Sequence, residues 1–198
     1  MDWRPNAEND RLALAILAGF LIARLVFGFS LGLGIDESYT IAISRRLSLS
    51  YFDHPPLHLW IAHFAALAVG ENVVARAPFA ALFFATGWIF YRLTSGLFDP
   101  QAALVALFAL NVTPFFFASA GSWIVPDGPL LFGLALAAFG LIRNTAGDPL
   151  GKAIPLSPAT WRNVSGWSEM IPSTPMSIMR AMSAGLFTVQ TTTRSPRL

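Results

Sequence analysis

The sequence predicts an all-α membrane protein: a polytopic bundle of about four transmembrane helices, with short amphipathic helices beside the membrane on its external side. Hydrophobic residues make up 55% of the chain and charged residues 12%, whereas soluble domains carry about 25% charged residues. The charged residues also collect in short segments between long apolar runs. The small net charge of +2 and the scattered basic residues argue against a nucleic-acid partner. The absence of cysteine excludes a disulfide framework and a thiolate metal site.

Four apolar runs are the predicted spans, and they cover residues 12–33, 73–93, 101–118 and 128–142. The first run has about 22 residues, or about 33 Å of helix, which is enough to cross a hydrocarbon core of about 30 Å. The apolar region of a cleaved signal peptide has only about 7–15 residues. We therefore expect the first run to remain in the membrane as an anchor. The third run is expected to break near Pro114.

The polar segment between the first two spans, residues 34–72, is predicted to be an external loop with two short helices. The first is expected over residues 38–48. The residues that would stack on one side of it are Tyr39, Ile43 and Leu47. Pro55 and Pro56 suit the first turn of the second helix, where a missing N–H is harmless. Its apolar part, residues 57–69, is too short to span and suits an interfacial or re-entrant element.

The arginines near the ends of the spans predict the orientation of the chain. If residues 57–69 do not cross the membrane, all these arginines fall on one side: Arg4, Arg11, Arg92 and Arg143. The positive-inside rule assigns that side to the cytoplasm. Residues 1–11 are therefore predicted to be a cytoplasmic N-terminus. The residues predicted to face the outside are Asp36, Glu37, Asp53, His54 and Asp127.

The segment from residue 144 to 198 differs from the rest of the chain. It is rich in Ser, Thr and Pro, and no run in it is long enough to span a bilayer. No helical or alternating periodicity holds for more than a few residues. These features predict a poorly ordered cytoplasmic tail. They also fit a frameshift product that does not belong to the ancestral fold, and a single sequence leaves both interpretations open.

The first candidate site residues are Asp36 and Glu37, which directly follow the first predicted span. A carboxylate beside a low-dielectric surface has a raised pKa and can act as a general base. Acidic residues are also favoured at a solvated helix N-terminus, which gives a purely structural alternative. Position alone therefore supports both a catalytic and a capping role.

The second group consists of Asp53 and His54 before the two prolines, and Asp127 where the fourth span begins. The N–H groups at a helix start attract anions, and a nearby imidazole adds a donor. This pattern fits a phosphate or metal site; the alternative is a capping acid and a surface histidine. An acid beside a membrane segment is equally a cap or a site residue.

Two arginines and two further histidines complete the candidates. Arg76, near the outer start of the second span, can meet a phosphate or extend to the interface. Arg24 lies deep in the first span, where charges face protein or a polar cavity, and we expect a structural partner. His58 and His63 do not share one helix face, so we expect them to pack at the interface rather than bind a metal.

The order of these features resembles a known family. A first span is followed by DESY, YFDHPPLHLW, ARAPFAALF and VPDGPLLF. This order is similar to the polytopic glycosyltransferases of the GT-C fold, in particular the bacterial branch related to the protein O-mannosyltransferases and the lipid A aminoarabinose transferase. The resemblance covers about residues 12–143, and it implies a partial GT-C fold in a bacterial inner membrane.

The resemblance also implies roles for the candidate residues. Asp36 matches the catalytic acid, the general base that activates the acceptor, and Glu37 is its companion. Asp53 and His54 match the motif near the phosphate of the sugar carrier, where many relatives have Glu-Lys. Asp127 matches a further acidic position. Some relatives bind a divalent cation near this site, and the sequence assigns no metal ligands here.

The partners that the resemblance implies are a polyprenyl-phosphate sugar donor, membrane lipids and an acceptor that is a lipid, a protein or a glycan. The expected reaction is transfer of the sugar to that acceptor on the external face of the membrane. Family members have many more spans than this chain, and the resemblance implies that those spans supply part of the lipid groove and the acceptor site, so the sequence leaves open whether this chain is active alone. The alternative from another class is a non-catalytic membrane protein, either a truncated remnant or an assembly partner. A transporter is disfavoured because no broken midplane helix pair is evident.

Overall fold

A computed structural model describes residues 6–145, and within them every regular element is a helix. The elements are α1 (Ala7–Ser30), α2 (Ile35–Ser44), α3 (Pro56–Val69), η1 (Val73–Arg76), α4 (Ala77–Leu97), α5 (Pro100–Val112), η2 (Phe115–Ala120) and α6 (Asp127–Thr145). The predicted all-α helix bundle is confirmed. The predicted tail from residue 146 onward, and residues 1–5 of the predicted cytoplasmic N-terminus, lie outside the described residues.

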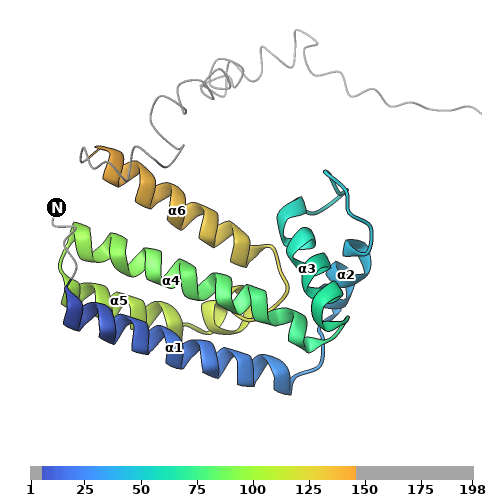
Figure 1. Ribbon diagram of the computed structural model, residues 1–198, viewed down its shortest axis with the longest axis horizontal. Coiled ribbons are helices and arrows are strands. Elements are labelled where there is room, and N and C mark those ends of the chain that lie inside the picture. The colour runs from blue at the N-terminus through green and yellow to red at the C-terminus, as the bar shows by residue number, and fades with distance from the viewer. Residues whose placement is uncertain (1–5, 146–198) are drawn as a thin grey trace, which may run out of the picture.

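Four helices form the bundle, and two lie across one end of it (Figure 1). Helices α1, α4, α5 and α6 lie side by side and alternate in direction, while α2 and α3 pair with each other at the end where α1 stops. The start of α1, the α4–α5 connection and the end of α6 lie at the opposite end. Arg11, Arg92 and Arg143 therefore lie at one end, and Asp36, Asp53 and Asp127 at the other.

That separation of charge agrees with the sidedness expected from the sequence. Two helical segments, Ala7–Ser30 and Val73–Leu97, are long and apolar enough by length and composition to cross a membrane. Helix α5 is shorter because Thr113 has an extended ψ of 123° before Pro114, and a proline disfavours helical backbone in the residue before it. The chain then continues as η2, so the predicted break near Pro114 is present. The crossing of all four helices and their orientation stay predictions.

Two hydrophobic clusters hold the elements together. One lies between α1, α4 and α5 and consists of Ala13, Leu17, Tyr91, Ala103 and Leu107. The other joins α2, α3, the start of α4 and the α5–α6 loop, and consists of Ile41, Ala62, Ala65, Ala75, Phe79 and Ile124. Gly87 allows α1 and α4 to approach closely, because a Cβ there would lie 2.6 Å from Leu17 Cδ2.

The first of the two short helices, α2, differs from the prediction in its bounds and in the residues that share one side of it. It starts at Ile35 because the Glu37 side chain accepts the Gly34 N–H at 2.8 Å and so satisfies a free donor at the helix start. The buried face consists of Glu37, Thr40, Ile41 and Ser44. The predicted face was wrong: Tyr39 is exposed, and Leu47 lies beyond the end of the helix. The spacing of apolar residues predicted the wrong side of α2 because three of its four buried residues, Glu37, Thr40 and Ser44, are polar.

Candidate active site

Two networks of polar contacts, made by side chains and backbone groups, lie at the end of the bundle that carries α2 and α3. We call the first the buried junction, which consists of Gly28, Leu31, Gly32, Glu37, Arg76 and Ile124. We call the second the polar cluster, which consists of Tyr39, Asp53, His54 and His58. The charged side chains of the buried junction are buried, whereas Tyr39 and Asp53 of the polar cluster are exposed. The two groups therefore differ in whether a bound molecule can reach them.

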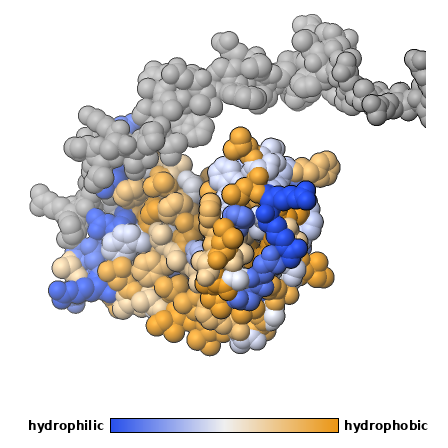
Figure 2. Space-filling model, turned by 45° about the vertical axis from the view of Figure 1, so that its right-hand side comes forward, coloured by the Kyte–Doolittle hydropathy of each residue, from blue (hydrophilic) through white to orange (hydrophobic). Residues whose placement is uncertain are grey.

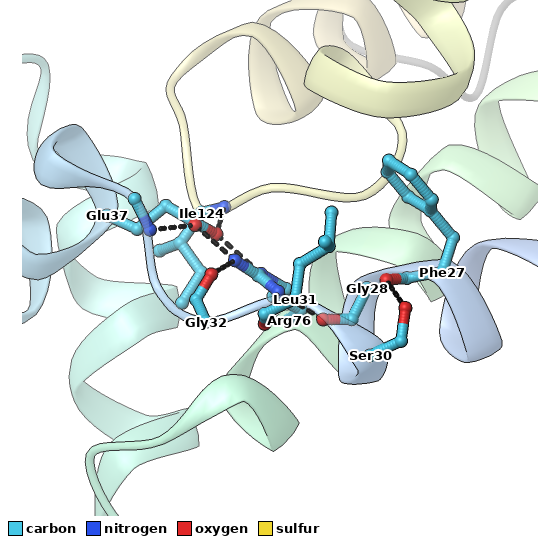
Figure 3. A network of polar contacts seen from close by, with 9 residues as sticks. Phe27, Gly28, Ser30, Leu31, Gly32, Glu37, Arg76 and Ile124 are labelled. Atoms are coloured by element: carbon cyan, nitrogen blue, oxygen red, sulfur yellow. Dashed lines mark hydrogen bonds and ion pairs between the residues drawn. The ribbon is translucent and has the colours of Figure 1, made fainter.

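Arg76 is the centre of the buried junction (Figure 3). It ends η1, directly before α4, and its side chain is 2% exposed. Its Nη1 donates to the carbonyl oxygens of Gly28 and Leu31, and its Nη2 to that of Gly32 at 2.9 Å. A helix leaves its last carbonyls without partners within the helix. The guanidinium supplies donors to the carbonyls at the end of α1, where a cation is also favoured by the helix dipole.

Glu37 is the matching anion of the junction. Its Oε1 accepts from Arg76 Nε at 2.7 Å and from the Ile124 N–H at 3.1 Å, and its Oε2 contacts Arg76 Nη2. The side chain is 2% exposed. Burial alone would raise the pKa of Glu37, but the hydrogen bonds from Arg76, Gly34 and Ile124 lower it below its ordinary value. Glu37 is therefore an ionised carboxylate that joins the start of α2 to η1 and to the loop before α6, and through Arg76 to the end of α1.

Asp36 precedes Glu37 in the chain and has the opposite environment. It is exposed, in the first turn of α2, whose start is fixed by the Glu37 contacts. A helix places neighbouring residues about 100° apart, so one acid of the pair faces the junction while the other faces outward. The structure thus holds Asp36 on an anchored helix end and leaves its carboxylate accessible.

Three members of the polar cluster are linked through Asp53. Tyr39 Oη donates to Asp53 Oδ2 at 2.7 Å, and His54 Nδ1 lies 2.8 Å from Asp53 Oδ1. The contacts with His54 and Tyr39 hold the pKa of Asp53 below its ordinary value. The same contact with Asp53 raises the pKa of the Tyr39 hydroxyl. Because Asp36 and Tyr39 are neighbours on the α2 surface, the cluster extends toward Asp36.

His58, the fourth member of the polar cluster, lies against His54 and near enough to Asp127 for that carboxylate to influence its pKa. Its ring centroid is 5.3 Å from that of His54, and the residue is 1% exposed. Burial lowers the pKa of His58, while the carboxylates of Asp127 and Asp53 act more weakly in the opposite direction. Asp127 opens α6 and is half-buried. The expectation that His58 packs at the interface was wrong: it is buried beside the candidate site. The apolar residues around it in the sequence gave no sign of this position.

Arg24 lies away from both groups, in the interior of the bundle. Its Nη1 donates to Asn111 Oδ1 at 2.8 Å, and its guanidinium carbon lies 4.5 Å from the centroid of the Phe83 ring. The side chain is buried against α5 and η2. The expected structural partner for this arginine is confirmed.

The other candidate residues fall as follows. Within residues 6–145, no three His, Cys, Asp or Glu side chains are arranged to hold a metal ion, so the divalent cation stays a prediction. The structure brings Asp53 and His54 together and places Asp127 near His58. Arg76 faces Glu37 instead of joining the polar cluster.

A comparison with protein families gives one match. The model of the dolichyl-phosphate-mannose-protein mannosyltransferase family matches residues 53–153, about half of the 198 residues. The matched segment starts at Asp53 and includes Arg76 and Asp127, but not Asp36 or Glu37. Comparisons with curated proteins and with solved structures gave no match. The family consists of membrane glycosyltransferases of the GT-C type and implies a polyprenyl-phosphate-linked sugar donor. The chain belongs to the dolichyl-phosphate-mannose-protein mannosyltransferase family.

Proposed function

We propose that this chain forms part of the catalytic region of a membrane enzyme that transfers a sugar from a polyprenyl-phosphate donor to an acceptor hydroxyl outside the cell. The acceptor is a lipid, a protein or a glycan. The observation that carries the proposal is the exposed Asp36 on an anchored helix start, beside the polar cluster. An accessible carboxylate on a rigid element is what a general base requires.

The proposed reaction needs one proton transfer and one leaving group. The acceptor oxygen attacks the anomeric carbon of the sugar, the bond from that carbon to the phosphate oxygen breaks, and Asp36 takes the acceptor proton. The departing polyprenyl phosphate carries the resulting negative charge. Phosphate cannot enter hydrocarbon without a large cost, so the reaction belongs at the membrane surface.

His54 and the start of α3 are the proposed phosphate partners. Asp53 lies against His54 Nδ1 and orients the ring, while Tyr39 holds Asp53 from the other side. Pro55 and Pro56 begin α3, and no side chain caps its first turn, so its N–H groups are free to bind an anion. Asp127 lies near enough to His58 to influence it, and so borders the same region.

Glu37 and Arg76 have a positioning role in this proposal. Both side chains are 2% exposed, and each is engaged by the other and by backbone groups. A phosphate contact by Arg76 would require it to leave the carbonyls at the end of α1. We therefore assign proton transfer to Asp36 alone, and assign to Glu37 the orientation of the helix start.

The experiment is sugar transfer from a polyprenyl-phosphate donor by the full chain in lipid vesicles. Asp36→Asn is expected to lower turnover by about 10²–10⁴-fold, the contribution of general base catalysis. Asp99→Asn makes the same change at the opposite end of the bundle, where asparagine caps α5 as well as aspartate does, and should retain activity. Equal turnover by Asp36→Asn and the unchanged chain would refute the assigned base. Donor binding without any turnover by the unchanged chain would favour the non-catalytic alternative.

A further inference from the structure

One arginine of α1 contacts both sides of the break at Pro114, between α5 and η2. Before the proline, Arg24 Nη1 donates to the Asn111 side-chain oxygen at 2.8 Å; after it, Arg24 Nη2 donates to the Phe116 carbonyl at 3.4 Å. The Asn111 amide is itself held, because its Nδ2 donates to the Leu107 carbonyl at 2.8 Å. Proline interrupts the hydrogen bonds of a helix, so the angle at such a break depends on contacts from outside the helix. The guanidinium of Arg24 supplies them.

The packing around Arg24 holds its guanidinium in place. The residue is 3% exposed, and its guanidinium carbon lies 4.5 Å from the centroid of the Phe83 ring and 5.2 Å from that of Phe117. Gly121, directly after η2, closes over the same group: a Cβ there would lie 2.5 Å from Arg24 Nε. Figure 2 shows hydrophobic residues over most of the bundle surface between the hydrophilic residues at its two ends, so little water can replace a lost contact inside. Arg24 thus fixes both the start and the end of η2 against α1.

The loop after η2 leads from this contact to the buried junction. Ser122 folds back on η2, and its Oγ donates to the Phe117 carbonyl at 2.6 Å. Two residues further on, the Ile124 N–H donates to Glu37 Oε1 at 3.1 Å (Figure 3). Ser122 and Ile124 are both buried, so this loop has little freedom of its own. A change in the orientation of η2 therefore moves the N–H that holds Glu37.

The same face of α1 reaches the junction a second time. Arg24 and Gly28 are four residues apart and both buried, so they lie about one turn apart on one face of the helix. The Gly28 carbonyl accepts from Arg76, the partner of Glu37. One helix thus sets the spacing between the contact with η2 and the contact with Arg76.

Stability alone does not explain a cation at this position. Within residues 6–145, no carboxylate contacts Arg24, and its Nε has no hydrogen-bond partner. A buried charge is costly, and its replacement by apolar groups of similar volume is often neutral or stabilising. An apolar side chain would pack among the same phenylalanine rings, but it could not hold an acceptor on each side of the break.

We propose that Arg24 is a positioning residue for Asp36. It fixes η2 across the break, and η2 with the following loop fixes the Ile124 N–H. That N–H helps to hold Glu37 and the start of α2, which carries Asp36. The position of α2 follows from these contacts alone, whereas the effect of Arg24 on sugar transfer rests on the proposed function.

Spin labels measure the position of α2 without any reaction. The chain has no native cysteine, so nitroxides can be attached selectively through Ser38→Cys on exposed α2 and Val105→Cys, 70% exposed on α5. Position 105 is a fixed reference, because Ala103 and Leu107 belong to the cluster between α1, α4 and α5. Double electron–electron resonance gives the distribution of distances between the two labels for the full chain in bilayer discs.

Two variants remove the contacts across the break. Arg24→Met/Asn111→Leu removes the cation together with its side-chain acceptor, so that neither is left unpaired. Arg24→Lys keeps a cation among the aromatic rings, and so retains the fold should the double variant lose it, but one ammonium cannot take the places of both Nη1 and Nη2. The matched control is Thr86→Val, which removes another buried polar group of the bundle, a hydroxyl on α4 that donates to the Leu82 carbonyl at 2.9 Å.

The distance distribution is expected to broaden in both Arg24 variants and to stay unchanged in Thr86→Val. Sugar transfer should fall in the Arg24 variants by up to about 10²-fold, the cost of a misplaced catalytic group. An unchanged distribution in both variants would overturn the proposal, as would equal broadening in Thr86→Val, which would show a general loosening of the bundle.

The transfer measurement separates this proposal from the proposed function. Broadening with undiminished transfer would overturn the positioning role if Asp36→Asn is inactive. If Asp36→Asn also transfers sugar normally, the assigned base fails instead, and the broadening still supports the control of the α2 position by Arg24.

Discussion

The two ends of α2 carry the same kind of ion pair in opposite environments. At its start, Glu37 and Arg76 are both 2% exposed and also engage backbone groups at the end of α1 and in the loop before α6. At its end, Arg45 and Glu71 form a pair at 2.6 Å, but their side chains are 63% and 42% exposed. The chemistry of the two pairs is alike, so burial decides what each contributes. The start of α2 is a fixed anchor for Asp36, while its end is a solvated surface.

The largest expected effect comes from breaking the buried pair. Arg76→Met leaves the Glu37 carboxylate buried without its cation and removes donors from the carbonyls at the end of α1. Removal of one partner of a buried pair costs about 3–5 kcal/mol of unfolding free energy. Thermal unfolding in detergent measures the loss. The double variant Glu37→Gln/Arg76→Met should recover part of it, because no unpaired charge is then buried.

A buried arginine without a carboxylate partner should be less sensitive. Asn111→Leu removes the Oδ1 acceptor that Arg24 uses at 2.8 Å, but leaves the aromatic rings around the guanidinium. Loss of one buried acceptor costs about 1–3 kcal/mol. The same unfolding measurement should rank this variant below Arg76→Met. The reverse order would mean that the bundle interior, and not the buried junction, is the more sensitive polar region.

Acidification should weaken the fold through His58. Burial lowers its pKa in the folded state, so the unfolded chain takes up a proton near the ordinary value of 6.5 while the folded chain does not. Stability is therefore full above pH 6.5 and falls as the pH drops from there toward the lowered pKa, by at most about 1.4 kcal/mol per pH unit. Unfolding followed from pH 7.5 to 5.5 should show this slope. His58→Asn should flatten it, and an unchanged slope would assign the effect to another group.

The smallest effect is expected at the exposed end of α2. Arg45→Gln removes the partner of Glu71, but exposed ion pairs contribute little because water and salt screen them. The melting temperature should match that of the unchanged chain at physiological salt. A loss as large as that of Arg76→Met would mean that exposure does not separate the two pairs.

The sequence predicts the parts of this fold that depend on local chemistry. Pro114 ends α5 and Pro56 begins α3 because proline restricts the backbone next to it. The candidate acids Asp36, Asp53 and Asp127 lie at the end opposite Arg11, Arg92 and Arg143 because the apolar runs alternate in direction. These features are readable from residue type and spacing alone.

The roles of the two acids are not readable in that way. Arg76 is 39 residues from Glu37, and Ile124 is 87 residues from it, so their contacts follow from tertiary packing. The one local signal was a glutamate in the first turn after Gly34, where its side chain can reach back to the free N–H. This local signal distinguishes Glu37 from Asp36 in the sequence.

The most direct test of the account measures sugar transfer and thermal unfolding on the same two variants. We expect Asp36→Asn to lose transfer while its melting temperature stays unchanged, because its side chain is exposed. Glu37→Gln is expected to lower the melting temperature, because it breaks the buried junction. The account is contradicted if Asp36→Asn transfers sugar normally while Glu37→Gln melts normally and is inactive, since Glu37 would then be the catalytic acid.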